Sequence, residues 1–199
     1  MTAAKTDEKW ELVFDAASDV FAQYGFRRTS MNDIAQAAGM SRPALYLLFE
    51  NKEDLFRRLA NYRQSLAIDE AVSILASDAP FAERFIEAIL AYERVFYEPV
   101  AASPHGAEFL DLNISVASDD MKKGHERLIA HLGDAMATAA ADGAVTLDGV
   151  SMAPRAFVEI LMSSVGGQKR AATSIKDFRK RVKQVASVFL TSIARGGAQ

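Results

Sequence analysis

The stretch that decides the fold spans residues 25–59 and reads GFRRTSMNDIAQAAGMSRPALYLLFENKEDLFRRL. Ser30 and Asp33 have the spacing of a capping box, in which each side chain bonds the backbone amide of the other, so a helix is predicted to begin at Met31. Gly39 tolerates left-handed backbone angles and is predicted to end that helix. The stretch therefore opens with one short helix and a glycine turn.

Two more helix starts follow this turn. Ser41 is an N-cap residue, and Pro43 falls in the first turn of the helix behind it, where a missing amide proton costs nothing. Asn51 is the third cap, and Glu53 and Asp54 place negative charge near the positive end of the helix that it starts. Two short helices joined by a tight turn form a helix-turn-helix, so the sequence predicts that motif here.

The outward residues of the second short helix are the candidates for contact with DNA, because the recognition helix of this motif lies in the major groove. Arg42 carries the forked donors that bind guanine, and Ala44 and Leu47 offer apolar contact to a thymine methyl group. Tyr46 and Lys52 are suited to phosphate oxygens, as are hydroxyls beside the free amides of a helix N-terminus. The predicted DNA-binding set is Thr29, Ser30, Ser41, Arg42, Pro43, Ala44, Tyr46, Leu47 and Lys52.

Members of this set also have structural interpretations. Ser30 and Ser41 serve equally well as helix caps that never touch DNA. Arg42 and Lys52 would be solvated surface charges in most proteins, and only their position around the motif suggests more. Pro43 disfavours helical backbone angles at the preceding residue, which leaves the direction of the Arg42 side chain open.

With the amphipathic helix predicted at Trp10–Tyr24, the stretch Phe26–Leu55 resembles the N-terminal DNA-binding domain of TetR-type transcriptional regulators. The segments that carry the resemblance are Ala16-Ala17, Phe21, Gly25-Phe26, Thr29-Ser30, Asp33-Ile34-Ala35, Ala38-Gly39-Met40-Ser41, Leu45-Tyr46, Phe49 and Asn51-Lys52-Glu53-Asp54-Leu55. One departure is Leu47-Leu48, which stands where family members often have polar aromatic residues after the tyrosine. This departure lowers the hydrogen-bonding capacity of that face.

The resemblance implies an all-α protein with two domains. Residues 1–51 would form a three-helix helix-turn-helix DNA-binding domain, and residues 52–199 a helical ligand-binding and dimerisation domain. The family further implies a cytoplasmic homodimer on a palindromic double-stranded DNA operator, most simply a repressor released by a small apolar or amphipathic molecule. The alternatives are an activator of the same fold and, more distantly, a helical small-molecule-binding protein or enzyme without DNA binding.

Apolar residues at three- and four-residue spacing predict helices through the rest of the chain, with no alternating strand pattern. The residues predicted to face inward on the helix that begins at Lys52 are Leu55, Phe56, Leu59 and Leu66. The next helix opens at Pro80 and is predicted to end at Pro99, since proline breaks a helix interior. Later helices are predicted from Ser118, from Pro154 and from Ser174.

A regulatory ligand site is predicted among the middle helices, where aromatic and flexible apolar side chains accumulate. The predicted lining residues are Phe85, Tyr92, Phe96, Phe109, Asn113, Met136, Phe157 and Met162, with Asn113, His125 or Gln168 as polar anchors. Each of these residues taken singly is more typical of an ordinary core.

The last two helices are candidates for a dimer interface, because their apolar faces include small residues that allow close approach. The predicted interface residues are Phe157, Leu161, Ser164, Val182, Ala186, Phe189 and Ile193. The alternative is a core within one chain. The resemblance favours the interface, since these regulators pair through two C-terminal helices about a twofold axis.

Composition and charge narrow the function classes. The chain has 199 residues, a formal net charge of −3 and no cysteine, which excludes disulfides and is typical of a reducing cytoplasm. Residues 1–63 carry nine basic and nine acidic side chains, so the acidic excess lies elsewhere. No apolar run is long enough to span a membrane, and we expect no membrane among the partners of the protein.

Little in the sequence predicts catalysis. His105, His125 and His131 lack the spacing of metal ligands, and no glycine-rich phosphate loop or nucleophile elbow is present. Glu83 and Glu87 share one face of a predicted helix, where a solvated acidic edge explains them better than a catalytic pair. We therefore expect no metal, no cofactor and no enzymatic activity.

Overall fold

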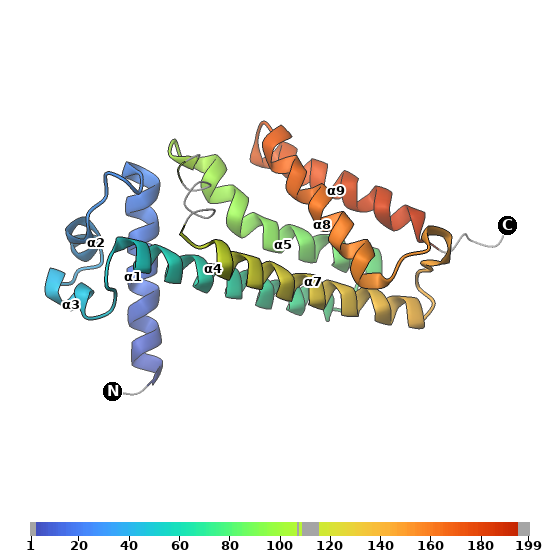
Figure 1. Cartoon of the computed structure of the whole chain (residues 1–199), viewed down its shortest axis with the longest axis horizontal. Helices are drawn as coiled ribbons and strands as arrows, with labels where there is room; N and C mark the ends of the chain where they lie inside the picture. Colours follow the sequence, from blue (N-terminus) through green and yellow to red (C-terminus); the bar gives the residue numbers. More distant parts are fainter. Residues whose placement is uncertain (1–2, 107, 109–115, 195–199) are drawn as a thin grey trace. The chain divides into compact units, whose positions relative to one another are not determined.

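The computed structural model describes residues 3–106, 108 and 116–194, and helices account for most of them (Figure 1). The described elements are α1 (Ala3–Tyr24), α2 (Met31–Ala37), α3 (Arg42–Tyr46), α4 (Lys52–Leu75), α5 (Phe81–Ala102), α7 (Ser118–Ala141), the 3-10 helix η1 (Asp148–Val150), α8 (Pro154–Ala171) and α9 (Ile175–Ser192). The only β pairing in the described part is an isolated antiparallel bridge between Val145 and Ala194. The predicted all-α class is confirmed.

The described residues fall into two compact units. The N-terminal unit lies within Met1–Arg63 and Pro99–Met121, and the C-terminal unit lies within Gln64–Glu98 and Lys122–Gln199. Three helices, α4, α5 and α7, contribute residues to both units. The packing thus divides the chain inside α4, whereas the predicted division into a DNA-binding and a ligand-binding domain lies at its first residue. That functional division stays a prediction.

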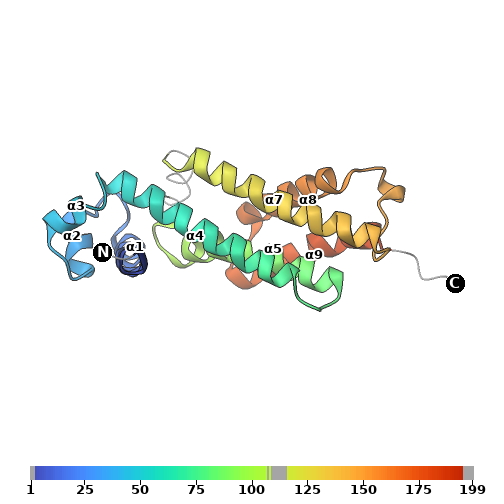
Figure 2. The ribbon, with the colours of Figure 1, turned by 90° about the horizontal axis from the view of Figure 1, so that it is seen from below.

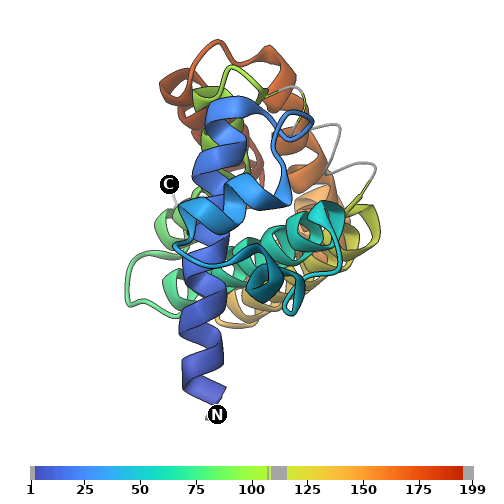
Figure 3. The same cartoon turned by 90° about the vertical axis from the view of Figure 1, so that its left-hand side faces the viewer.

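The N-terminal unit is built around an aromatic core. Phe14 and Phe21 of α1 are buried with Phe49 and Phe56, and Phe26 packs edge-on against Phe56 at 5.5 Å between ring centroids. Helix α2 lies across α1, and α3 packs against α2 (Figure 3). Aromatic rings bury large apolar areas, so a few of them stabilise a unit whose helices α2 and α3 are too short to persist alone.

The C-terminal unit has a separate core, to which α4, α5, α7, α8 and α9 contribute. Its largest fully buried side chains are Ile68, Phe85, Ile89, Leu128, Leu132 and Met136. The last two helices pack against each other along their lengths, as two views of the ribbon show (Figures 1 and 2). Ser174 caps α9 by accepting a hydrogen bond from the amide of Asp177, as the sequence predicts.

Two predictions about helix interiors are wrong. α5 continues through Pro99 to Ala102 instead of ending there. A proline so close to the end of a helix removes one backbone hydrogen bond, which the last turn tolerates far better than a helix centre does. Leu66, predicted to face inward on α4, is 49% exposed.

Candidate nucleic-acid interface

The start of α2 is fixed by the predicted capping box. The amide of Ser30 donates to Asp33 Oδ2 over 2.8 Å, and the amide of Asp33 donates to Ser30 Oγ over 3.3 Å. Hydrogen bonds from the Ser30 side chain and backbone lower the pKa of the Asp33 carboxyl below its usual value. Met31, Ile34 and Ala35 face the core. The N-terminus of α2 is therefore held at the surface with its first turn ordered.

The turn and the second short helix also follow their predicted chemistry. Gly39 has a φ of +65°, which L side chains rarely adopt. Ser41 accepts a hydrogen bond from the amide of Ala44 over 3.3 Å, and Pro43 sits in the first turn. Leu45 is fully buried and anchors α3 to the unit. With its inward side fixed in this way, α3 presents its other side to solvent.

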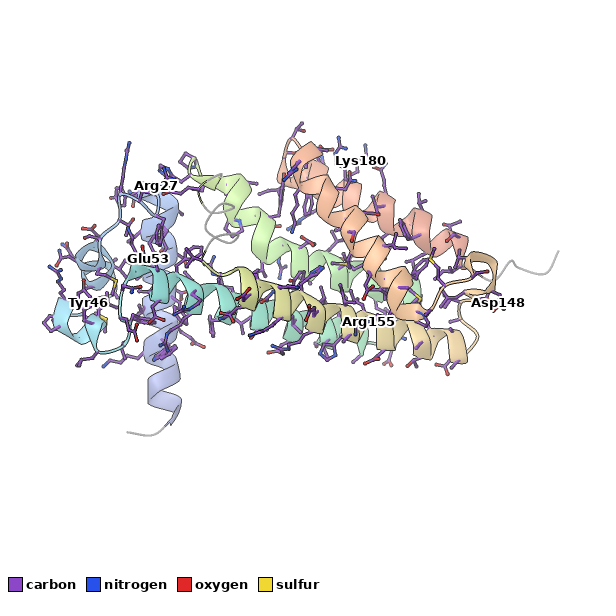
Figure 4. The ribbon with its side chains drawn as sticks, in the orientation of Figure 1. Arg27, Tyr46, Glu53, Asp148, Arg155 and Lys180 are labelled. Atoms are coloured by element: carbon purple, nitrogen blue, oxygen red, sulfur yellow. The ribbon has the colours of Figure 1, made fainter. Side chains whose placement is uncertain are left out.

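The outward side of α3 carries three large side chains. The Arg42 guanidinium lies 5.4 Å from the centroid of the Tyr46 ring, a cation–π contact along one face of the helix. Tyr46 lies on the outer surface of the unit (Figure 4). Leu47 is 87% exposed, which is unusual for an apolar residue of this size. The surface offers donors, an aromatic ring and an aliphatic tip side by side.

Lys52 at the start of α4 is bound within the unit. Its ammonium donates to the carbonyl oxygens of Phe26 and Thr29, each over 2.7 Å, and lies 4.4 Å from the centroid of the Phe26 ring. Two of its three N–H donors are thereby engaged, which leaves one for an external acceptor. The side chain ties the segment between α1 and α2 to the first turn of α4.

The predicted DNA-binding residues differ in their exposure. Ser30, Ser41, Arg42, Pro43, Tyr46 and Leu47 are exposed on the N-terminal unit, and Ala44 and Lys52 are partly buried. Thr29 is buried, and its hydroxyl donates to the carbonyl oxygen of Gly25 over 2.7 Å. The hydroxyl of Thr29 therefore has a partner inside the protein.

Two arginines left out of the predicted set also lie beside α2. Arg27 and Arg28 are exposed directly before the capping box (Figure 4 labels Arg27). Arg27 approaches Glu108 at 3.7 Å, whereas Arg28 and Arg42 have no ion pair with any residue that the structure describes. Two adjacent cations immediately before a helix N-terminus favour contact with phosphate, because both features attract it.

The segment after α5 is bonded to the end of α1. The Ser103 hydroxyl donates to the carbonyl oxygen of Ala22 over 3.0 Å, and the amide of Arg27 donates to Glu108 Oε1 over 2.8 Å. Gly25, with a φ of +81°, lies beneath the Glu108 carboxylate and the His105 ring. The absence of a side chain at Gly25 is what lets them approach.

The predicted ligand-binding residues that the structure describes lie in one core. Phe85, Tyr92, Met136, Phe157 and Met162 are all buried in the C-terminal unit. Burial raises the pKa of Tyr92 to about 12, and its hydroxyl accepts a hydrogen bond from Gln64 over 3.1 Å. Phe109, Asn113 and the side chain of Phe96 lie outside the described residues.

The predicted dimer residues are divided between core and surface. Phe157, Leu161, Val182, Ala186 and Ile193 are buried within the C-terminal unit, and Ser164 and Phe189 are partly buried. The exposed large apolar residues of the same two helices are Ile160, 45% exposed, and Val188, 70% exposed. These two side chains are the ones that a partner could cover.

No group of three or more histidine and acidic side chains in the described part of the chain is arranged to hold a metal ion. None of the described helices has an apolar stretch long enough to cross a lipid bilayer.

Comparison with known proteins gives the motif a family. Residues 13–59 match the family model described as "Bacterial regulatory proteins, tetR family". An uncharacterized HTH-type transcriptional regulator of Mycobacterium tuberculosis is 31% identical over 129 residues, which are 64% of this chain and 53% of that protein. The probable acrEF/envCD operon repressor of Escherichia coli is 38% identical over 65 residues, 33% of this chain and 30% of the repressor.

The fold extends the likeness beyond the matched residues. SmeT, the repressor of the Stenotrophomonas maltophilia multidrug efflux pump SmeDEF, aligns with a TM-score of 0.71 at 17% identity over 94% of this chain and 91% of SmeT. SmeT has also been solved in complex with triclosan. In sequence, the chain covers 29% to 53% of the lengths of the first relatives that it matches. The matched motif and its capped geometry lead to one conclusion: residues 13–59 form a helix-turn-helix region of the type found in the tetR family of bacterial regulatory proteins, and the chain as a whole shares the fold of SmeT.

Proposed function

We propose that this protein is a cytoplasmic transcriptional repressor that binds a palindromic DNA operator as a homodimer and is released by a small molecule. The observation that carries the proposal is the outward face of α3, where Arg42, Tyr46 and Leu47 are exposed on a helix fixed by its Ser41 cap and buried Leu45. These exposed side chains are not needed to stabilise a five-residue helix. They are the kinds of side chain with which a recognition helix contacts bases and phosphates in a major groove.

Arg42 and Leu47 are assigned to base edges, and Tyr46 and the region before α2 to the phosphate backbone. A guanidinium donates two parallel hydrogen bonds to guanine, and an exposed leucine offers apolar contact to a thymine methyl group. Arg27 and Arg28 add positive charge beside the free amides at the start of α2. The role is binding, and no reaction is assigned to the chain.

Release by a ligand would act through α4, which begins at Lys52 beside the motif and continues to Leu75 within the core of the C-terminal unit. A ligand in that core shifts α4 and changes the spacing of the two recognition helices of the dimer. A coupling free energy of about 1–3 kcal/mol is enough to lower operator affinity by tens of times. An activator would share the interface with DNA, and the sign of the effect of the ligand on transcription distinguishes the two.

Selection of bound duplexes from a random-sequence DNA pool, at a fixed and stated salt concentration, tests the proposal. We expect enrichment of a palindrome whose half-sites are about one helical turn apart. The folded wild-type protein failing to enrich any sequence, before and after refolding from denaturant, would contradict DNA recognition.

Variants then assign the contacts. Arg42→Ala should relax the base preference at one position of each half-site, at a cost of about 1–3 kcal/mol for the preferred base. Lys180→Ala, which removes an exposed charge on α9 far along the sequence from the motif (Figure 4), should leave the enriched sequence unchanged. Equal losses on all sequences for Arg42→Ala would instead place this residue on phosphate.

A further inference from the structure

A buried carboxylate lies in the core of the C-terminal unit. The Glu93 side chain on α5 is only 3% exposed, and the Lys169 ammonium on α8 lies 2.7 Å from its Oε2. That oxygen receives no hydrogen bond of good geometry from any described residue, so charge, not a directed bond, holds the pair. Desolvation offsets most of the attraction in such a pair, and a buried ion pair is therefore a poor stabiliser of a core.

Lys169 and Glu93 differ in how readily their charged groups can move out of the core into water. Lys169 is 31% exposed and has a long flexible stem, so its ammonium can turn outward into water. Glu93 has a short side chain enclosed by the core and cannot follow. Whenever Lys169 turns outward, a negative charge stays behind without compensation. The fixed charge of this region is therefore negative.

Two of the neighbouring groups, Tyr92 and His125, have aromatic rings that are uncharged at neutral pH. The rings of Tyr92 and His125 lie 6.3 Å apart between centroids, and Gln64 holds the Tyr92 hydroxyl over 3.1 Å. Burial lowers the pKa of His125, although Glu93 opposes this, so its imidazole is neutral at pH 7. Burial raises the pKa of Tyr92 to about 12. Aromatic rings beside a carboxylate suit a cation.

We propose that the ligand of this protein carries a positively charged amine on an apolar body, and that its ammonium replaces that of Lys169 at Glu93. The inference rests on the proposed function in one respect, the presence of a regulatory ligand site in the C-terminal unit. It adds the chemical class of the ligand. Glu93 receives the charge, the Tyr92 and His125 rings, on both of which the charge of Glu93 acts, lie nearby, and Lys169 moves to solvent.

Three probes with the same body and different charge test the class of ligand. 4-Phenylbutylamine is cationic at pH 7, 4-phenylbutanol is neutral and 4-phenylbutyrate is anionic. Binding of each to the whole wild-type protein is measured by isothermal titration calorimetry. We expect the amine to bind at least about tenfold more tightly than the other two, because only a cation can take the place of the Lys169 ammonium at Glu93.

Variants identify the carboxylate. Glu93→Gln keeps the side-chain volume and removes the charge, so the preference for the amine should disappear. Lys169→Met removes the competing ammonium, so the amine should bind more tightly. Glu87→Gln is the matched control: Glu87 is also on α5 and also pairs with a lysine, Lys183, at 2.8 Å, but both side chains are about half exposed. Its substitution should leave the affinity for the amine unchanged.

The inference is overturned if none of the probes binds, if the three bind equally, or if the preference for the amine persists in Glu93→Gln. The wild-type series gives this answer even where a variant fails to fold. These measurements need no DNA, so failure of the ligand class is separate from failure of operator selection. If an amine binds through Glu93 but the protein selects no DNA sequence, the proposed ligand class is supported and the proposed repressor function is contradicted.

Discussion

At the scale of single residues, Gly25 meets two separate demands. Its φ of +81° is unfavourable for any L side chain, and a Cβ there would lie 2.6 Å from Glu108 Oε2 and 3.0 Å from His105 Nδ1. The Glu108 carboxylate would move aside and give up its hydrogen bond from the Arg27 amide. Gly25→Ala should therefore lower the free energy of unfolding by about 1–2 kcal/mol for the backbone and about 1 kcal/mol more for the lost bond.

Gly39 provides the control for this prediction. Its φ of +65° is also left-handed, but a Cβ there meets nothing within 4 Å. Urea denaturation of Gly39→Ala should therefore show the backbone cost alone. Equal losses in the two variants would mean that the hydrogen bond from the Arg27 amide to Glu108 contributes nothing to stability.

Lys52 can act in two ways, by holding the fold together or by contacting DNA phosphate directly, and a substitution tells the two apart. Because its ammonium binds the carbonyl oxygens of Phe26 and Thr29, Lys52→Met should lower the free energy of unfolding by about 1–3 kcal/mol. It should also weaken binding to all DNA sequences alike, since the segment before α2 is no longer held. Denaturation and DNA titrations over a range of salt concentrations measure the two effects.

A lysine that only contacted phosphate would behave differently. Its loss would reduce the salt slope of DNA binding by about one and leave stability unchanged. Lys9→Met, at an exposed position of α1, is the control for removal of a positive charge. A Lys52→Met protein as stable as the wild type would show that the two carbonyl contacts have no structural role.

At the scale of elements, the cap of α2 makes stability depend on pH. The pKa of Asp33 is lower in the folded protein than in the unfolded chain, chiefly because the Ser30 side chain and backbone donate to its carboxylate. The contribution of ionised Asp33 to the stability of the fold is therefore present above its pKa in the unfolded chain, about 3.9. This contribution is lost as the pH falls through its lower pKa in the folded protein.

Ser30→Ala tests this dependence. The substitution should lower the free energy of unfolding by about 1 kcal/mol at pH 7, the usual cost of losing an N-cap. Below about pH 4 its difference from wild type should shrink, because protonated Asp33 no longer accepts the same hydrogen bonds. Chemical denaturation at pH 7 and at pH 3 measures both values. If the difference in the free energy of unfolding between Ser30→Ala and wild type is the same at the two pH values, the Asp33 carboxylate does not contribute to the cap.

The elements that the sequence predicted best are those that start with a local signal. Ser30, Ser41 and Ser174 each bond an amide three residues along the chain, and such a contact can be predicted from residue type and spacing alone. The predicted end of α5 at Pro99 is wrong because the cost of a proline depends on its distance from the helix end, and no local signal in the sequence marks that end.

Contacts between distant residues lay beyond sequence reasoning. The carbonyl oxygens that Lys52 binds belong to residues 23 and 26 positions earlier, so a surface position was the natural prediction for its ammonium. In the same way, the pairing of Glu93 with Lys169 across α5 and α8 leaves no periodic pattern in the sequence. The exposed face of α3 was predicted because it is simply what the buried Leu45 leaves outward.

At the scale of the whole molecule, a neutral DNA-binding region makes assembly important. Residues 1–63 have equal numbers of basic and acidic side chains, so in the proposed repressor we expect the attraction of one subunit to the DNA backbone to be weak. A homodimer doubles the interface, and its twofold axis matches a palindrome. Operator affinity should therefore depend on the dimer more than it does in a strongly basic protein.

The exposed apolar side chains of α8 and α9 are where this dependence can be tested. Val188 is 70% exposed and Ile160 is 45% exposed, and a dimer through these helices would cover both. Val188→Asp would bury a charge without a partner in that interface. We expect sedimentation equilibrium to show a dimer for the wild type and at least about tenfold weaker association, or about 1.4 kcal/mol, for the variant.

Leu66→Asp is the matched control, because Leu66 is 49% exposed on α4, outside both helices. It should leave the dimer intact, and both variants should keep the helical circular dichroism of the wild type. Val188→Asp should in addition lose most of its affinity for the palindrome while keeping its affinity for a single half-site, because recognition by α3 is unchanged. If the dimer survives Val188→Asp and dissociates with Leu66→Asp, the interface involves α4 and not α8 and α9.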